Sequence, residues 1–246
     1  MKSNHALIVG ASSGIGLAVA RRMKRDGFIV SGISRRTPPL DAVDSAMCCD
    51  VTEGEGLVEA IAQLKQKHGV PEVVVYSAGY PVMGKTLSVP ETEARCAFEV
   101  HFWGLDRLVR TILPEMKLHG GGTILAILSI AALCPPPFEA YYAASKSAVV
   151  AYLRGLSLES GRDNVRLKWL APGYVDTGFL ERGNWFGMSI PPVHGSGVTP
   201  DQIAEAALRI IRSGQDFRII GWKERCLALA ERISPSMCKR WFELKK

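Results

Sequence analysis

The sequence lacks the features that mark several classes of protein. It has no dense block of Lys and Arg of the kind that binds nucleic acid. It has no run of about eighteen apolar residues, the length that a membrane-spanning helix needs. It also has no internal repeat, low-complexity tract or linker. We therefore expect one globular unit that neither spans a membrane nor binds nucleic acid.

The six cysteines also lack any pattern that would define their chemistry. Their spacing is irregular and no CxxC pair occurs. The chain is neither short nor of secreted appearance, and its N-terminus enters a strand and a glycine turn at once, which leaves no room for a signal peptide. We expect reduced thiols, no metal site and a cytoplasmic protein.

What the sequence does have is apolar content, 47% of its 246 residues, which suits one sizeable domain and argues against disorder. The net charge of +6 fits an anionic ligand such as a phosphorylated cofactor, and equally an ordinary solvated surface.

Short apolar runs alternate with helical patterns along the chain. Alternating strands and helices predict a parallel sheet with helices on both faces. Strands are expected at 5–9, 28–33, 72–76, 122–128, 165–170 and 217–221, and helices at 16–25, 55–67, 91–118, 142–160 and 200–213, the last with Thr199 as N-cap.

A glycine-rich turn, Gly10-Ala11-Ser12-Ser13-Gly14-Ile15-Gly16, lies between the first strand and the first helix. Glycines there let the backbone approach a pyrophosphate, and the N-terminus of a helix favours its negative charge. The spacing is G-x-x-x-G-x-G rather than the common G-x-G-x-x-G. A tight turn that needs glycine only for its conformation is the alternative, but the position after an N-terminal strand favours dinucleotide binding.

The second strand ends at Ser34, Arg35 and Arg36, without the acidic residue that bonds the ribose 2′-hydroxyl in many NAD sites. Arg35 can pair with a 2′-phosphate through a charge-assisted fork, and Ser34 can add a hydroxyl contact. Two solvated arginines in a loop are the alternative. We favour NADP(H) over NAD(H).

Tyr142 and Lys146 stand four residues apart in a helical stretch, so they share a helix face. An ammonium group beside a phenol lowers the phenol's pKa from about 10 towards neutrality, which suits proton transfer. The pair alone can equally be a surface contact. The neighbouring Tyr141 has Ser145 four residues on, so we read it as packing or as lining of a substrate pocket.

Over residues 4–221 the chain resembles the short-chain dehydrogenase/reductase family. The motifs occur in the family's order, and Ser129 precedes Tyr142 by the family's usual thirteen residues. The motifs are the turn at 10–16, Asp50-Val51, Ser77-Ala78-Gly79, Ser129, Tyr142 with Lys146, and Pro172-Gly173-Tyr174-Val175-Asp176-Thr177.

The resemblance implies a single-domain Rossmann-type α/β/α sandwich with a mainly parallel seven-stranded sheet over residues 1–221. It implies that Asp50 bonds the adenine amino group with the Val51 backbone beside it. Many relatives form homodimers or homotetramers through the helices at 91–118 and 142–160. The cofactor contacts implied are Gly10, Ser12, Ser13, Gly14, Ile15, Gly16, Ser34, Arg35, Asp50, Val51, Ser77, Ala78, Gly79, Tyr142, Lys146, Pro172, Gly173, Val175 and Thr177.

By the same resemblance, Tyr142 donates a proton, Ser129 holds the carbonyl oxygen, and Lys146 activates the tyrosine and bonds the nicotinamide ribose. His101 stands where the family usually has an asparagine whose carbonyl holds a relay water. We expect His101 either to keep that carbonyl role, to join the relay through its imidazole, or simply to pack under the helix. Tyr76 replaces a common asparagine, and its role is open.

Residues 178–198 correspond to the variable substrate loop. Apolar walls there suit a lipophilic or aromatic substrate, although such loops can simply cover the core. The candidate wall residues are Cys134, Phe138, Tyr141, Phe179, Trp185 and Phe186.

The extension at 222–246 carries seven Lys/Arg and three Glu among apolar residues, with Pro235 dividing it into two short helices. It can lie on an anionic membrane, but we favour packing over the pocket or a partner subunit.

We predict an NADPH-dependent ketoreductase acting on a small-molecule ketone or secondary alcohol of lipophilic, aromatic or acyl/polyketide type. One alternative is an NAD(P)-dependent alcohol dehydrogenase of hydroxysteroid type. Another is a non-catalytic dinucleotide-binding sensor or scaffold, for which His101 is the only support.

Overall fold

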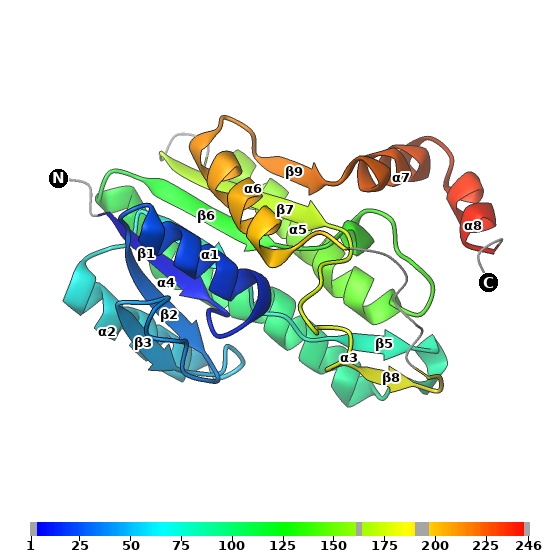
Figure 1. Ribbon diagram of the computed structural model, residues 1–246, viewed down its shortest axis with the longest axis horizontal. Coiled ribbons are helices and arrows are strands. Elements are labelled where there is room, and N and C mark those ends of the chain that lie inside the picture. Colours follow the sequence, from blue (N-terminus) through cyan, green and yellow to red (C-terminus); the bar gives the residue numbers. More distant parts are fainter. Residues whose placement is uncertain (1–3, 161–163, 190–196, 244–246) are drawn as a thin grey trace.

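The computed structural model describes residues 4–160, 164–189 and 197–243. Seven parallel strands form one sheet in the order β3-β2-β1-β4-β6-β7-β9 (Figure 1). The seven-stranded parallel sheet implied by the resemblance is therefore confirmed. The strands are β1 (His5–Val9), β2 (Ile29–Ser34), β3 (Ser45–Cys48), β4 (Val73–Tyr76), β6 (Gly122–Ile127), β7 (Val165–Pro172) and β9 (Phe217–Ile220).

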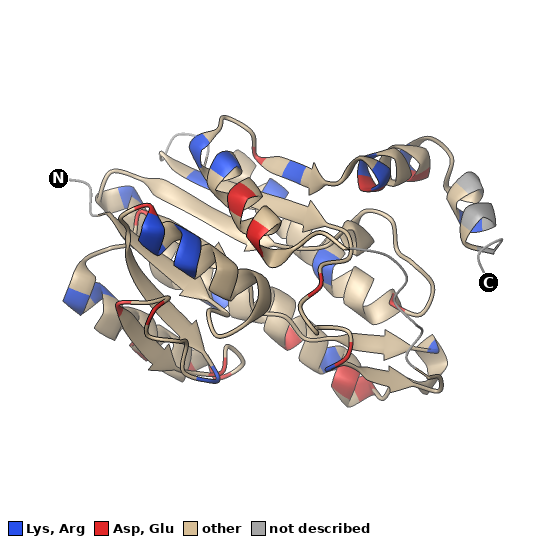
Figure 2. Cartoon of the chain, in the orientation of Figure 1, with Lys and Arg blue, Asp and Glu red and all other residues tan. Residues whose placement is uncertain are grey.

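Helices cover both faces of the sheet, which makes the three layers that the sequence predicts. One face carries α1 (Gly14–Arg25) and α6 (Pro200–Arg212). The opposite face carries α2 (Gly54–His68), α4 (Gly104–Leu118) and α5 (Ala140–Glu159). Lys and Arg are spread over the outer helices, with Asp and Glu among them (Figure 2).

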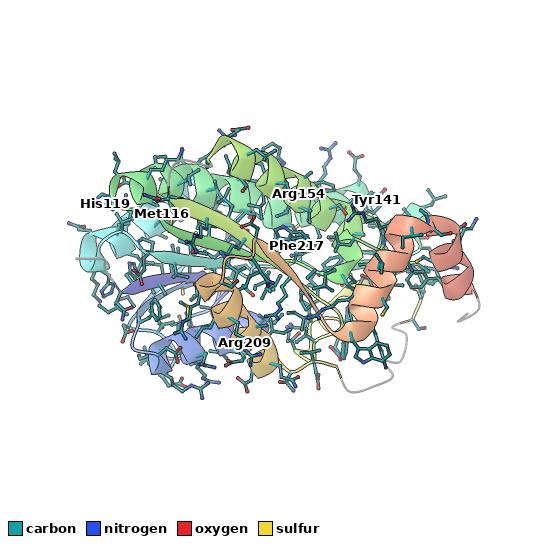
Figure 3. The ribbon with its side chains drawn as sticks, turned by 90° about the horizontal axis from the view of Figure 1, so that it is seen from above. Met116, His119, Tyr141, Arg154, Arg209 and Phe217 are labelled. Atoms are coloured by element: carbon teal, nitrogen blue, oxygen red, sulfur yellow. The ribbon has the colours of Figure 1, made fainter. Side chains whose placement is uncertain are left out.

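The alternation of strand β1 explains why its sequence is apolar throughout. Successive side chains of a strand point to opposite faces, so Leu7 and Val9 enter the core under α4 and α5, whereas Ala6 and Ile8 enter the core under α1 and α6. Burial on both faces is typical of central parallel strands. At the far edge, Phe217 of β9, labelled in Figure 3, stacks on Trp169 with ring centroids 4.7 Å apart.

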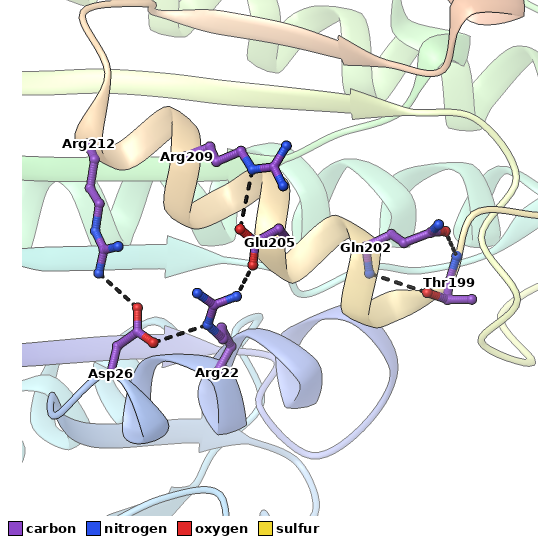
Figure 4. A network of polar contacts seen from close by, with 7 residues as sticks. All are labelled: Arg22, Asp26, Thr199, Gln202, Glu205, Arg209 and Arg212. Atoms are coloured by element: carbon purple, nitrogen blue, oxygen red, sulfur yellow. Dashed lines mark hydrogen bonds and ion pairs between the residues drawn. The ribbon is translucent and has the colours of Figure 1, made fainter.

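Helices α1 and α6 are joined by a chain of ion pairs (Figure 4). Arg22 of α1 contacts Glu205 of α6, and Arg212 contacts Asp26 at 2.8 Å. The predicted N-cap of α6 is also confirmed, because the Thr199 hydroxyl accepts from the Gln202 backbone while the Gln202 side chain accepts from the Thr199 backbone. The ion pairs fix α6 against the C-terminal half of α1.

The helical stretch expected at 91–118 is interrupted. It consists of α3 (Glu91–Phe98), a π-helical turn (Glu99–Trp103) and α4. The buried Tyr76 hydroxyl donates a 2.5 Å hydrogen bond to the Val100 carbonyl in that turn. The role of Tyr76, which the sequence leaves open, is therefore to support the turn that carries His101.

Among the described residues, strand β3 and four further short elements fall outside the ranges expected from the sequence. Two 3₁₀ turns occur, η1 (Thr86–Ser88) and η3 (Ile130–Ala132). A separate two-stranded parallel sheet pairs β5 (Val82–Gly84) with β8 (Asn184–Phe186). This pairing attaches the predicted substrate loop to the segment that follows β4, so both lie beyond the carboxyl ends of the main strands.

The C-terminal extension forms α7 (Trp222–Ile233) and α8 (Pro235–Glu243), divided at Pro235 as predicted. No residue of α7 is buried, and both helices lie beyond the end of the sheet (Figure 1). Residues 244–246 lie outside the described part of the chain, as do residues 190–196 of the substrate loop. Among the described helices, none has both the length and the apolar character that crossing a bilayer requires.

We predict that Tyr76 and Gly104 are energetically coupled. A Cβ added at Gly104 would overlap the Tyr76 hydroxyl, so Gly104→Ala should destabilise the protein by about 1–3 kcal/mol. In the Tyr76→Phe background the same change should cost clearly less, because the clashing oxygen is gone. Urea unfolding of the four proteins of this cycle measures the coupling.

Gly155→Ala is the matched control, since a Cβ there meets nothing within 4 Å. It should be neutral or stabilise the helix by up to about 1 kcal/mol. Additive effects of the Tyr76 and Gly104 changes would contradict the proposed packing.

Candidate functional site

A cavity of about 890 Å³ lies at the carboxyl ends of the strands. Its size is within the range of about 300–1,000 Å³ typical of ligand sites. It brings together the predicted catalytic residues Ser129, Tyr142 and Lys146. All the predicted cofactor contacts except Gly16 line it as well: Gly10, Ser12, Ser13, Gly14, Ile15, Ser34, Arg35, Asp50, Val51, Ser77, Ala78, Gly79, Pro172, Gly173, Val175 and Thr177.

The glycine turn owes its shape to close backbone approach. Gly10 has φ of +89°, and a Cβ there would come within 2.8 Å of the Ala78 nitrogen. A Cβ on Gly16 would overlap the Gly10 carbonyl. Gly16 therefore packs against the backbone of the turn instead of lining the cavity. A side chain at Gly10 or Gly16 would prevent this strand-to-helix connection.

Helix α1 begins at this turn without a side-chain cap. Ser13 is the N-cap residue, and its side chain makes no capping hydrogen bond. The first backbone N–H groups of a helix have no partner within the helix, and Ser13, Gly14 and Ile15 line the cavity. Uncapped N–H groups at a helix N-terminus fit a phosphate or pyrophosphate.

The end of strand β2 offers a cation at the same cavity. The Arg35 guanidinium is mostly exposed and lies 3.9 Å from an Asp50 oxygen, which is a long ion pair. Asp50 also accepts hydrogen bonds from the Thr52 backbone and hydroxyl, at 3.0 and 2.9 Å. The Ser34 hydroxyl donates to the Arg36 carbonyl at 2.7 Å, so its proton is already engaged. Arg35 is thus the group best placed here to meet an added phosphate.

Tyr142 and Lys146 both project from α5, and Ser129 lies two residues beyond strand β6, as the N-cap of η3. The Ser129 oxygen accepts from the Ala131 backbone at 3.1 Å, which fixes its rotamer. The Lys146 nitrogen donates to the Ile127 carbonyl at 3.3 Å and lies 5.8 Å from the centre of the Tyr142 ring. Tyr142 and Lys146 are 8% and 4% exposed, so both polar ends are held in a largely dry site.

Burial dominates the electrostatics of this pair. It raises the pKa of the Tyr142 phenol; the Glu139 carboxylate adds to the rise, and a hydrogen bond from Ser129 opposes it. Burial also lowers the pKa of Lys146 to about 7. The lowering of the tyrosine pKa by Lys146, expected from sequence, is absent in the protein alone, because burial is the largest influence on the phenol and raises its pKa. The phenol is held protonated, in the form that can donate.

His101 is 1% exposed and does not line the cavity. Its Nε2 accepts from the Tyr80 backbone N–H at 2.9 Å, and a backbone N–H can only donate. The ring proton of the neutral imidazole must therefore lie on Nδ1, which is 2.8 Å from the Ser145 oxygen. The Ser145 hydroxyl in turn donates to the Tyr142 carbonyl at 2.8 Å.

This geometry leaves His101 no free nitrogen with which to pass protons. Burial, and secondarily the charge of Lys146, lower the pKa of His101 well below its usual value, so the ring stays neutral. The imidazole can instead hold the loop after β4 against the catalytic helix.

Of the predicted substrate-wall residues, only Phe179 lines the cavity, and its ring centre lies 6.0 Å from that of Tyr142. Tyr141, labelled in Figure 3, packs against the small cluster around Val82 and Ala131. Trp185 donates to the Leu180 carbonyl from strand β8. The cavity lining does not include Cys134, Phe138, Tyr141, Trp185 or Phe186.

Several residues that line the cavity are not predicted from the sequence. Glu139 is half-buried three residues before Tyr142, and burial raises its pKa to about 7. Its spacing from Tyr142 is a signal that could have identified it, since residues i and i+3 are neighbours on a helix. Tyr80 directly follows the Ala78-Gly79 motif. Met83 lies on the unexpected strand β5, so no motif pointed to it.

Comparison with known proteins identifies relatives of this chain. A family model described as short chain dehydrogenase matches residues 4–184. Dehydrogenase/reductase SDR family member 4 of Bos taurus is 31% identical over 71% of this chain. A 3-ketodihydrosphingosine reductase of Bacteroides thetaiotaomicron is 30% identical over 75% of it. These matches span only 66% and 68% of the two relatives' own lengths.

A solved structure agrees over almost the entire length. A short-chain dehydrogenase from Streptomyces avermitilis superposes with a TM-score of 0.85 at 25% sequence identity. The superposition covers 98% of this chain and 97% of that one.

We predict that Lys146 makes the stability of the cofactor-free protein depend on pH. Its pKa of about 7 is below the unfolded value, so the unfolded chain binds more protons above pH 7, and stability should rise from there with pH. Lys146→Met removes this contribution. The free energy of unfolding of the variant should therefore exceed that of the wild type by the most near pH 6 and by the least near pH 9. Urea unfolding across that range is the measurement.

The exposed Lys85 provides the control, as Lys85→Met in the same experiment. A stability difference between wild type and Lys146→Met that does not change with pH would contradict the buried, weakly basic lysine.

Proposed function

Because the chain belongs to the short-chain dehydrogenase/reductase family, whose members are NAD(P)-dependent oxidoreductases of alcohol and ketone groups, we propose that this protein reduces a ketone with NADPH. The observation that carries the proposal is one cavity shared by the serine, tyrosine and lysine of the family motif and by the glycine turn. A hydride donor and a proton donor would then meet at one carbonyl group.

The residues present fit the cofactor. The uncapped start of α1 at Ser13 and Gly14 would hold the pyrophosphate, and Asp50 would face the adenine. The exposed guanidinium of Arg35, with only a long ion pair to Asp50, favours an added 2′-phosphate and hence NADP(H). When bound, this cofactor supplies the hydride.

The chain's own residues would handle the proton. The Ser129 hydroxyl would hold the carbonyl oxygen, and the buried Tyr142 phenol, which is protonated, would donate to that oxygen as negative charge develops. The Lys146 ammonium would bond the ribose and stabilise the phenolate left behind. His101 acts as a positioning residue in this scheme, since its hydrogen bonds reach α5 only through Ser145.

The substrate would be lipophilic. Phe179 and Leu180 contribute apolar surface to the cavity, Phe179 beside Tyr142, and apolar walls with few polar groups suit such a ligand. One relative is named a 3-ketodihydrosphingosine reductase, which supports a ketone on a long apolar chain. An assembly of two or four copies, as is common in the family, stays a prediction.

The test follows oxidation of NADPH and NADH by absorbance with small, aromatic and long-chain ketones. We expect preference for NADPH and for lipophilic ketones. Tyr142→Phe should lower kcat by about 10²- to 10⁴-fold, the usual contribution of a general acid. Tyr152→Phe, the same change on the same helix but outside the cavity lining, should retain activity.

Arg35→Ser should raise the KM for NADPH about tenfold or more, because a hydrogen bond to a charged group contributes about 1.5–3 kcal/mol. The KM for NADH should change little. Retained turnover in Tyr142→Phe would refute the assigned proton donor, and equal use of both cofactors by the wild type would refute the role of Arg35. NADPH binding without turnover of any ketone would favour the sensor function.

A further inference from the structure

Three metal-ligating side chains meet outside the cavity. Cys134, Glu231 and Cys238 place one sulfur or carboxylate oxygen each within 4.8 Å of the others. They come from separate segments: the loop after η3, helix α7 and helix α8. The two cysteines are 2% and 3% exposed, whereas Glu231 is half-buried. The cluster is therefore sheltered on its sulfur side and reachable from solvent on its carboxylate side.

The thiols have only weak partners in the protein alone. The Cys134 sulfur lies 3.9 Å from a Glu231 oxygen, and the Cys238 sulfur lies 3.8 Å from the Leu227 carbonyl. Both are long contacts of poor donors. The three ligand atoms face one another across contacts that a bound cation could replace.

The chemistry and spacing of the three groups fit a borderline-soft divalent cation. Zn²⁺ binds thiolate at about 2.3 Å and carboxylate at about 2.0–2.2 Å in a tetrahedral arrangement, which places ligand atoms roughly 3.5–4 Å apart. Ligand atoms already within 4.8 Å of one another need only small rotations to close on such an ion. Thiolate ligands select zinc over magnesium or calcium.

We propose that Cys134, Glu231 and Cys238 form a site for a zinc-type divalent cation, with water as the fourth ligand. Binding replaces the two thiol protons, which go to solvent, and involves no oxidation. The ion would join both C-terminal helices to the loop at 133–139.

That loop matters because it lies between Ser129 and Tyr142 in the chain. Pro136 and Glu139 of the loop line the cavity, and Phe138 has a φ of +68°, which is uncommon for a residue with a side chain. No residue of helix α7 is fully buried. A cation at Cys134 would therefore fix the tail and one wall of the cavity together.

The test uses the full chain, reduced and stripped of metal with a chelator, and titrated with Co²⁺ as a spectroscopic probe. We expect one Co²⁺ per chain, with a thiolate-to-cobalt absorption band that Zn²⁺ removes by competition. Zn²⁺ should also raise the Tm of the stripped protein. The band should be lost in Cys134→Ser and in Cys238→Ser, and retained in Cys226→Ser, an exposed cysteine of α7.

Glu231→Gln keeps the proposal testable if a cysteine variant fails to fold, because this side chain is half-buried. It should weaken Co²⁺ binding by at least about tenfold, since even indirect partners of a metal site contribute about 10- to 100-fold. Absence of the band in the wild type, or its persistence without Cys134 or Cys238, would overturn the proposal. So would a Cys134–Cys238 disulfide found in the protein as isolated.

Discussion

The arrangement of the site depends on one buried chain of hydrogen bonds. The Tyr80 backbone donates to His101, His101 donates to Ser145, and the Ser145 hydroxyl donates to the Tyr142 carbonyl. Every donor in this chain faces an acceptor, so the direction of each bond is fixed. Such a chain polarises its members cooperatively, and leaving any buried member without a partner would cost about 1–3 kcal/mol.

These hydrogen bonds connect three parts of the protein that have separate roles. Tyr80 follows the Ala78-Gly79 segment of the cavity and reaches α3 through its hydroxyl, which bonds Glu93 at 2.6 Å. Ser145 belongs to the helix that presents Tyr142 and Lys146. Between them, His101 stands in a π-turn.

The π-turn is itself supported from the sheet. Its Val100 carbonyl accepts from Tyr76 of strand β4. Strand β4, the loop at 78–80 and helix α5 are thus held in fixed positions relative to one another by side chains that take no part in the reaction.

Much of this could be predicted from the sequence. Apolar strands buried on both faces, the capped start of α6 and the glycine turn are local patterns with local causes, and they appear where expected. The motif residues gathered in one cavity because the carboxyl ends of parallel strands share an edge of the sheet. The break of the tail at Pro235 was also foreseen, since proline cannot continue a helix.

The rest depended on contacts between distant segments. Nothing in the sequence around His101 indicates that a backbone N–H would occupy one of its nitrogens. The pairing of β5 with β8, and the meeting of Cys134 with Cys238, likewise join segments about a hundred residues apart. The low basicity of Lys146 follows from burial, and the depth of burial of a helix face is set by the whole fold.

The central claim is that His101 is a neutral, fixed connector in this site. The most direct test is the nitrogen NMR spectrum of protein labelled in its histidine rings, recorded from about pH 5 to 8.5, with His101→Asn to assign the signal. We expect a neutral ring with its proton on Nδ1 at every pH where the protein stays folded. A His101 that titrates near its ordinary pKa of about 6.5, or that carries its proton on Nε2, would contradict it.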